Sequence, residues 1–371
     1  MRRFILVITV LALAVAGEKA EAVVKVVTTL QDYAAIAREL GGERVEVQGI
    51  VPGNSDPHFI KPKPSYALML RDADLLVSTG LDLELWLPVL ENKAGNRRIL
   101  EGTAGYVSAG QGIELLEKPV SLSRALGDVH VYGNPHIHTS PLNARVIARN
   151  IATGLCKVDP EGCPEYQKNL EAFQSRLSEK LYGAELVKLL DIETLDALAA
   201  RGALSSFLAE HGLTEKLGGW LGQAQPLRGQ KLVTYHKNWA YFATLLGIQV
   251  VGYVEPKPGI PPSARHVAEL IELIAAEKVP VLLCVNYFER SKPEAITQRT
   301  GVRLVWVPLS VGGEAGVDSY EALVDLWISR LTAALAEASN PTGAPAGPHV
   351  RERHRGRRDQ GSAPRPGEAQ P

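Results

Sequence analysis

Apolar runs alternate with amphipathic segments from residue 23 to about residue 337. Runs rich in β-branched residues predict buried strands, whereas apolar residues that recur at three- and four-residue steps predict helices. Alternating strands and helices build βαβ units on a parallel sheet, where ligands gather at the carboxyl ends of the strands. We therefore predict an α/β fold with two βα halves. The predicted strands cover residues 23–29, 45–51, 74–78, 231–235, 250–253, 279–285 and 302–307.

One long predicted helix separates the two halves. A long helix with βα units on both sides is typical of a domain connector. We therefore expect an N-terminal lobe at residues 23–163, a connecting helix at 164–195, a helical insertion at 196–229 and a C-terminal lobe at 230–338. The apolar residues that recur at helical spacing in the connector are Tyr166, Leu170, Phe173, Leu177 and Leu181.

Two segments have less regular patterns. Residues 101–133 are rich in Gly, Ser and isolated charges without a clear period, which predicts a surface loop. Residues 195–208, within the insertion, predict one helix. The pattern of the insertion gives it no functional interpretation.

The two ends of the chain have compositions that differ from the rest. Arg2 and Arg3 precede an apolar run at residues 4–16, and Ala20-Glu21-Ala22 is typical of a signal-peptide cleavage site, so we remove residues 1–22 from the fold. The run is shorter than the ~20 residues of a membrane span, which disfavours a retained anchor. No cysteine lies at the cleavage site, so we expect a soluble periplasmic protein without a lipid anchor. Residues 339–371 are rich in Pro, Gly and Arg and predict a disordered tail.

Composition and cysteines fit an exported globular protein. The chain has 371 residues, 45% of them hydrophobic, and a formal net charge of -1, which does not favour a nucleic-acid or membrane-surface partner. Cys156 and Cys163 flank a turn-forming sequence, and in an oxidising compartment this spacing favours a disulfide. Cys284 lies in a strand-like run and is expected to be a buried thiol.

Three histidines stand at the expected ends of strands. His58 follows Pro57 in a proline-rich loop, His136 follows Pro135 in the same way, and His236 comes directly after the strand at residues 231–235. Proline leaves such a loop little freedom, which suits a side chain that must hold one position. Imidazole is the commonest protein ligand for zinc. We predict that these three side chains converge on one metal ion, although each histidine taken singly is more typical of a surface or capping residue.

A fourth ligand should come from the second half. Asp318 is the best candidate, because the glycines before it let the backbone bring a carboxylate close to an ion. The alternative interpretation is that Asp318 caps the helix that follows. Three imidazoles and one carboxylate favour zinc, whereas manganese prefers more oxygen ligands.

These motifs carry a family resemblance. Asp56-Pro57-His58 with the following Pro-x-Pro-Ser run, and the stretch at residues 80–87, resemble the front half of the solute-binding proteins of ABC-type zinc and manganese importers. Asn134-Pro135-His136 is similar to their second ligand motif. The segments that begin at His236 and at Gly316 are similar to the third and the fourth. The resemblance covers roughly residues 23–337.

The resemblance implies a fold and a partner. It implies two four-stranded lobes with parallel sheets joined by one rigid helix, a metal site in the cleft between the lobes, and delivery of the ion to the membrane permease of an importer. We expect a monomer that is not an enzyme and binds no nucleic acid, with Zn²⁺, or alternatively Mn²⁺, as its cargo. Two departures stand out. The loop before His136 has a single histidine, His130, so a role in collecting zinc is doubtful, and His138 stands where the family has Trp, which makes it a possible alternative to His136.

The main rival hypothesis is a secreted zinc hydrolase. Such an enzyme keeps one metal position open for water and places a general base beside it. No His-Glu-x-x-His helix motif occurs in the chain. Glu255 is the acidic residue to watch as a base, although its proline-flanked loop is more typical of a cleft wall.

Overall fold

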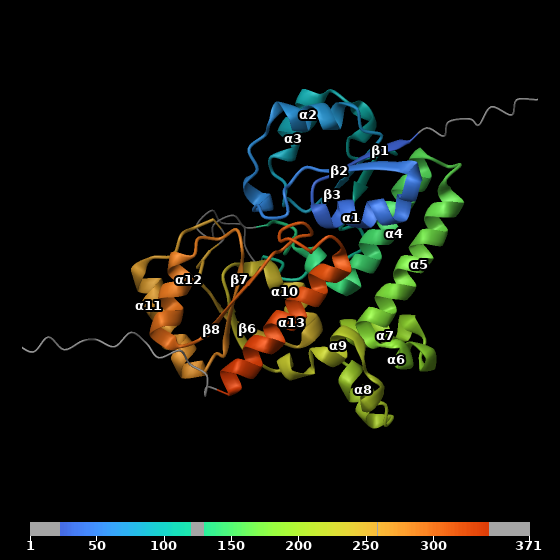
Figure 1. Ribbon diagram of the computed structural model, residues 1–371. Coiled ribbons are helices and arrows are strands. Elements are labelled where there is room, and N and C mark those ends of the chain that lie inside the picture. Colours follow the sequence, from blue (N-terminus) through green and yellow to red (C-terminus); the bar gives the residue numbers. More distant parts are fainter. Residues whose placement is uncertain (1–22, 120–129, 258, 341–371) are drawn as a thin grey trace, which may run out of the picture.

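Two parallel β-sheets organise the computed structural model, which describes residues 23–119, 130–257 and 259–340 (Figure 1). The first sheet has the order β2-β1-β3-β4 and the second the order β6-β5-β7-β8. In both sheets the chain adds its second strand on one side of the first strand and the later strands on the other side. The predicted signal peptide and, apart from Ser339 and Asn340, the predicted tail lie outside the described residues. The strands are β1 (Val24–Thr28), β2 (Val45–Gly49), β3 (Leu75–Ser78), β4 (Tyr106–Ser108), β5 (Lys231–Thr234), β6 (Gln249–Tyr253), β7 (Val281–Val285) and β8 (Arg303–Val307).

Helices connect the strands and cover the sheets (Figure 1). This two-lobed α/β fold is the predicted one. The helices of the N-terminal lobe are α1 (Gln31–Gly41), α2 (Pro64–Arg71), α3 (Leu87–Ala94) and α4 (Pro141–Val158). Those of the C-terminal lobe are α10 (Ala240–Leu246), α11 (Ala264–Glu277), α12 (Ser291–Thr300) and α13 (Tyr320–Ser339). Among the described residues, none of the helices has the length and apolar character to cross a membrane.

Strand β4 lies inside the segment that the sequence predicted as a surface loop. Tyr106 pairs with Leu76, and Ser108 pairs with Ser78, at the edge of the first sheet. Three residues are too few to show an alternating pattern, so only the neighbouring β3 reveals this strand.

The connecting helix α5 (Cys163–Tyr182) runs along one side of the molecule (Figure 1). It ends at Tyr182 rather than at residue 195, because Gly183 adopts a positive φ of 84° that other residues rarely adopt. The single helix expected at residues 195–208 is broken in the same way at Gly202, with φ 68°. The predicted end of the connecting helix instead forms α6 (Ala184–Leu189) and the start of α7 (Ile192–Ala200), and the insertion continues with α8 (Leu204–Glu210) and α9 (Gly219–Gln223).

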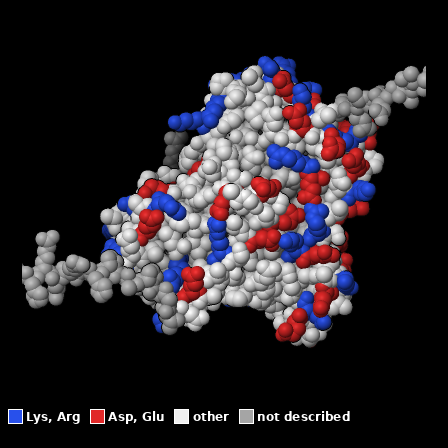
Figure 2. Space-filling model, viewed as in Figure 1, with Lys and Arg blue, Asp and Glu red and all other residues white. Residues whose placement is uncertain are grey.

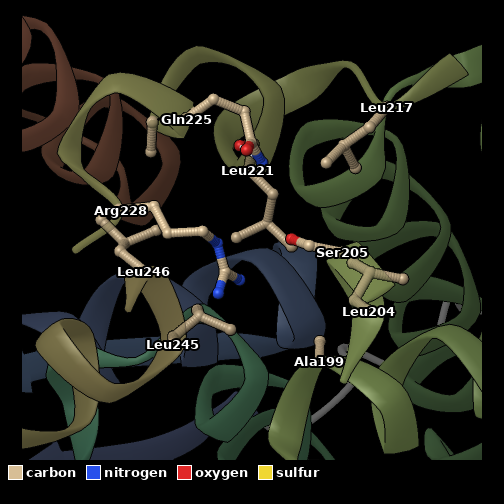
Figure 3. A pocket seen from close by; sticks show the side chains of 10 residues that line it. Ala199, Leu204, Ser205, Leu217, Leu221, Gln225, Arg228, Leu245 and Leu246 are labelled. Atoms are coloured by element: carbon tan, nitrogen blue, oxygen red, sulfur yellow. Dashed lines mark hydrogen bonds between the residues drawn. The ribbon is translucent and has the colours of Figure 1, made fainter. Parts of the chain in front are cut away.

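The insertion packs against the C-terminal lobe. Figure 3 shows a small pocket there, lined by Leu204 and Leu221 of the insertion and by Leu245 of α10, with the guanidinium of Arg228 pointing into it. None of the histidines lines this pocket. The insertion therefore extends the apolar core without contributing to the histidine cluster.

The cysteines behave as the sequence predicts. Cys156, near the end of α4, forms a disulfide with Cys163, the first residue of α5. Cys284 is buried in β7, and burial raises the pKa of its thiol. The disulfide therefore joins the N-terminal lobe to the connecting helix, and Cys284 is an inert core residue.

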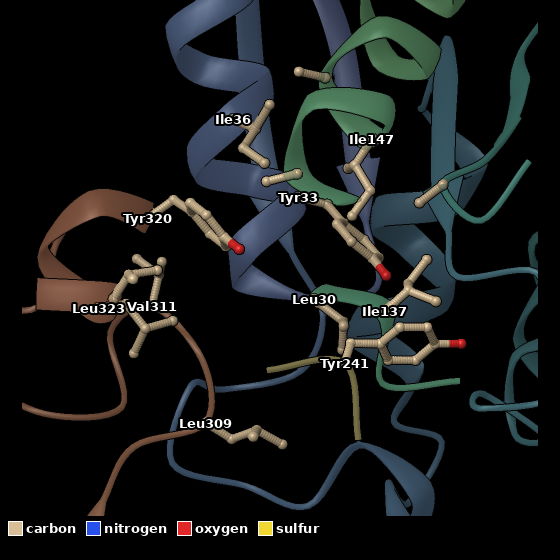
Figure 4. Packing of buried hydrophobic residues seen from close by; sticks show 14 of the residues in the cluster. Leu30, Tyr33, Ile36, Ile137, Ile147, Tyr241, Leu309, Val311, Tyr320 and Leu323 are labelled. Atoms are coloured by element: carbon tan, nitrogen blue, oxygen red, sulfur yellow. The ribbon is translucent and has the colours of Figure 1, made fainter. Parts of the chain in front are cut away.

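The two lobes share one hydrophobic cluster. Figure 4 shows Leu30 and Tyr33 of the N-terminal lobe close to Val311, Tyr320 and Leu323 of the C-terminal lobe, and all five are buried. Since apolar area removed from water is the main stabilising term in folding, this cluster holds the lobes together.

Polar contacts also cross between the lobes. Tyr320 donates its hydroxyl to the carbonyl of His138 at 2.9 Å, and Tyr241 donates to the carbonyl of Asn134 at 2.6 Å. The carboxylate of Asp32 in α1 accepts a hydrogen bond from the Ser310 hydroxyl and another from the backbone N–H of Val311. The bonds from Tyr320 and Tyr241 fix the backbone on either side of the predicted ligand His136.

Side chains of both charge signs are interspersed on the face drawn in Figure 2. No single-sign stripe runs across this face, which agrees with the net charge of -1.

We predict that the interlobe carboxyl of Asp32 makes stability depend on pH. Burial raises the pKa of Asp32 to about 6, so the folded state binds this proton more tightly than the unfolded state. Its ionisation therefore lowers the free energy of unfolding as the pH rises from about 4 to about 6. The Asp32→Asn variant keeps an acceptor oxygen for Ser310 and carries no charge. Relative to wild type, its free energy of unfolding should increase across this range by on the order of 3 kcal/mol.

Urea unfolding of both metal-free proteins at a series of pH values measures this difference. Asp72→Asn is the control, because that carboxylate is exposed and paired with Arg71. A difference between Asp32→Asn and wild type that does not change with pH would contradict the prediction.

Candidate metal centre

Three histidines from both lobes meet at one point. His58 lies in a short 3-10 helix (Pro57–Phe59) after β2, His136 immediately precedes a 3-10 helix (Ile137–Thr139), and His236 follows β5. One ring nitrogen from each lies within 4.8 Å of the others. The ring centroids of His58 and His136 are 5.1 Å apart, and each is 5.4 Å from that of His236. The structure thus brings together the three histidines that the sequence predicted as ligands.

The two Pro-His loops hold their histidines by the same device. The Oδ1 atom of Asp56 accepts from the backbone N–H of His58 at 3.0 Å and lies 2.7 Å from its Nδ1. The Oδ1 atom of Asn134 does the same for His136, at 2.9 Å from both atoms. An oxygen two residues earlier therefore fixes both the backbone and the ring. Each ring is left with Nε2 as its free nitrogen.

His236 is oriented by a different acid. Its Nδ1 hydrogen-bonds to Oε2 of Glu255, which follows β6 in the C-terminal lobe. The second oxygen, Oε1, accepts from the backbone N–H of Gly259 at 2.9 Å. Both oxygens of Glu255 are thus engaged, and the carboxylate acts on the far side of the imidazole from its free nitrogen. In metal sites, a partner of this kind fixes the tautomer and the direction of a histidine ligand.

Burial keeps the central imidazole neutral. His136 is 1% exposed, and desolvation, together with the neighbouring His58 and His236, lowers its pKa well below the usual value. Its Nε2 is buried and has no hydrogen-bond partner among the described residues. A bare, neutral ring nitrogen in a buried site is the form that binds a transition metal.

Burial and the neighbouring His58 have opposite effects on the pKa of Asp56. Desolvation by itself would raise the pKa of Asp56, but the hydrogen bonds and the charge of His58 outweigh it and hold that pKa below its ordinary value. Asp56 is therefore an ionised carboxylate at neutral pH. An ionised partner makes Nδ1 the protonated nitrogen of His58, which leaves Nε2 to bind.

The other predicted ligands lie outside the group of three. Asp318 is exposed, and the helix cap that it could have provided comes from Ser319, whose hydroxyl accepts from the N–H of Ala322. His138, the alternative to His136, is buried with its ring 6.5 Å from that of Tyr33, edge to face. Its ring centroid is 6.3 Å from that of His136.

One histidine at the site was not among the predicted ligands. His130 precedes the second Pro-His motif, and its Nε2 lies 3.2 Å from Nε2 of His58. The sequence pattern predicted only that His130 is the single histidine of a surface loop. The orienting residues Asp56 and Asn134 were also missed as such, although their equal spacing before His58 and His136 was a usable signal.

Comparison with known proteins agrees with this geometry. The family model for "ZnuA: Zinc-uptake complex component A periplasmic" matches residues 26–220 and 214–334. The chain belongs to this family. The sequence resemblance to solute-binding proteins of zinc and manganese importers is thereby confirmed.

Relatives within this group carry different metals in their names. The chain is 26% identical over 315 residues to "Iron-binding protein YfeA" of Yersinia pestis, covering 83% of this chain and 85% of the relative. It is 25% identical to "High-affinity zinc uptake system protein ZnuA" of Bacillus subtilis, covering 71% and 70%. To "Manganese ABC transporter substrate-binding lipoprotein PsaA" of Streptococcus pneumoniae it is 24% identical, covering 81% and 85%.

The fold matches a solved structure of the same family. A structure titled "Crystal structure of ZnuA" aligns with a TM-score of 0.61 and 23% identity, covering 84% of this chain and 99% of the solved one. This similarity confirms the predicted two-lobed α/β fold.

We predict that removing the oxygen behind His58 weakens metal binding. Asp56→Ala leaves Nδ1 and the backbone N–H of His58 without their common acceptor, so the ring loses its fixed direction. Zinc affinity should fall by about 10- to 100-fold, the usual cost of losing such a partner. Competition with a zinc chelator of known affinity measures the change. Asp72→Ala, at an exposed site away from the histidines, should bind as wild type does, and equal affinities for the two variants would contradict the prediction.

Proposed function

We propose that this protein captures a divalent transition metal, most simply zinc, outside the cytoplasm and delivers it to the permease of an ABC importer. The observation that carries the proposal is the meeting of three imidazoles from two lobes, each held by a partner on the far side of its ring. The membership in a family of periplasmic zinc-uptake proteins supports the same function.

In this proposal His58 and His136 form a half-site on the N-terminal lobe, and His236 completes it from the C-terminal lobe. The lobes already share a hydrophobic cluster, so the half-sites face each other before the ion arrives. The ion replaces its water with ring nitrogens and fastens the loops that carry them. Capture and release need no covalent step, and we propose no enzymatic activity.

We propose zinc rather than manganese as the cargo. Three neutral imidazoles make a nitrogen-rich site, which suits zinc in four-coordinate geometry, whereas manganese favours carboxylate, carbonyl and water oxygens. A manganese-preferring protein is the alternative, since a relative named for manganese is about as similar as the one named for zinc.

A zinc hydrolase is disfavoured by the position of Glu255. A general base must be free to take a proton from metal-bound water. Both oxygens of Glu255 are instead bonded, one to His236 and one to Gly259. Capture for transport therefore fits the site better than hydrolysis.

The remaining proposals concern the setting of the protein. We propose that residues 1–22 direct export to the periplasm and are removed, that the mature protein carries no lipid anchor, and that it acts as a monomer. The disulfide between Cys156 and Cys163 supports an oxidising compartment. The absence of a cysteine at the cleavage site supports release from the membrane.

We predict that the metal-free protein binds about one zinc ion per chain and becomes more stable, by about 2.7 kcal/mol at a free zinc concentration 100 times the Kd. Calorimetric titration and thermal unfolding measure the two effects. Changing His58, His136 and His236 together to Ala should abolish both. Changing the exposed His211 to Ala is the matched control and should leave both unchanged.

A parallel titration with manganese tests the choice of metal. Zinc should bind more tightly than manganese at neutral pH. Tighter binding of manganese would favour the alternative cargo, and zinc binding that survives in the triple variant would exclude the site itself.

A further inference from the structure

His130 and His58 present facing ring nitrogens. The Nε2 atoms of the two rings are 3.2 Å apart, and their ring centroids are 5.2 Å apart. His58 has its Nδ1 bonded to the carboxylate of Asp56, so its proton sits there and Nε2 carries a bare lone pair.

The far side of His130 is also held. Its ring forms a hydrogen bond to the backbone of Asp82, which adopts a left-handed conformation with φ 59°. We assign this bond to Nδ1, because Nε2 faces His58. With its proton on Nδ1, the ring of His130 also has a bare lone pair on Nε2.

With the protons of both rings on Nδ1, no proton lies between the two Nε2 atoms, and a cation can take that place. Two ligand nitrogens on a tetrahedral zinc ion, each about 2.0 Å from it, are about 3.3 Å apart. The separation of 3.2 Å between His58 and His130, which is also within hydrogen-bond range, matches the distance between two nitrogen ligands of one zinc ion.

The acidic side chains at the site are already engaged. Asp56 accepts both the ring and the backbone of His58, and Glu255 uses its two oxygens on His236 and Gly259. Asp318 is exposed and lies outside the group of three histidines. Among these candidates, only His130 directs an unused ligand atom at a ring nitrogen of the site.

We propose that His130 supplies a fourth nitrogen ligand to the ion held by His58, His136 and His236. This inference rests on the proposed function. The ring centroids of His130 and His136 are 6.1 Å apart, so binding draws His130 toward the other rings, which its partly exposed position allows. A site of four imidazoles selects zinc over manganese more strongly than one completed by a carboxylate.

His130→Ala separates this ligand role from the rest of the site. Zinc affinity, measured against a competing chelator, should fall by at least about 10-fold. Manganese affinity should change by less than about threefold, because water readily fills an oxygen-preferring position. His211→Ala is the control for loss of a histidine, and Asp318→Ala should bind zinc as wild type does. A large loss of zinc affinity in Asp318→Ala, with none in His130→Ala, would overturn the inference.

X-ray absorption of the zinc-loaded wild-type protein tests the inference without a variant. Four imidazole ligands are expected in the wild type and three in His130→Ala. A count of three in the wild type would overturn the role of His130 while leaving the proposed function intact. A wild-type protein that takes up no zinc would instead overturn the proposed function itself.

Discussion

The hydrogen bond from an imidazole Nδ1 to an oxygen behind it decides which nitrogen each histidine presents. At His58 and His136 the oxygen belongs to the residue two positions earlier, so a short side chain in a proline-stiffened loop sets the direction of the ring. At His236 the oxygen comes from Glu255, 19 residues away, so that ring depends on the pairing of β5 with β6. The ring directions of His58 and His136 therefore depend on residues close in the sequence, whereas that of His236 depends on the pairing of strands.

The packing between the lobes places these half-sites opposite each other. Tyr241 and Tyr320 of the C-terminal lobe bond to backbone carbonyls on either side of His136, at Asn134 and His138. A movement that separated the lobes would break these bonds and expose the shared apolar cluster to water, which is costly. The hydrogen bonds within the two Pro-His loops and those from the C-terminal lobe therefore act together to keep His58 and His136 in place.

Much of this arrangement follows from local sequence signals. Apart from β4, the strands of both sheets and the disulfide depend on patterns that span a few residues, and the structure has them as predicted. It also brings His58, His136 and His236 together. Strand β4, the break at Gly183 and the approach of His130 to His58 could not be predicted, because each depends on a neighbour distant in the sequence or on one backbone angle. Asp318 lies in a glycine-rich sequence that suggested a ligand, but in the structure it is exposed and Ser319 provides the cap of α13.

The disulfide between Cys156 and Cys163 distinguishes chains by the compartment in which they lie, whether or not they have bound metal. Such a bond forms in an oxidising compartment, whereas the two cysteines stay reduced in the cytoplasm. A newly made chain therefore has two free thiols at the corner between α4 and α5, and an exported chain has none there. Since Cys284 is buried, thiol labelling of folded protein reports this pair alone among the three cysteines. The redox state of one corner thus marks which molecules have crossed the membrane.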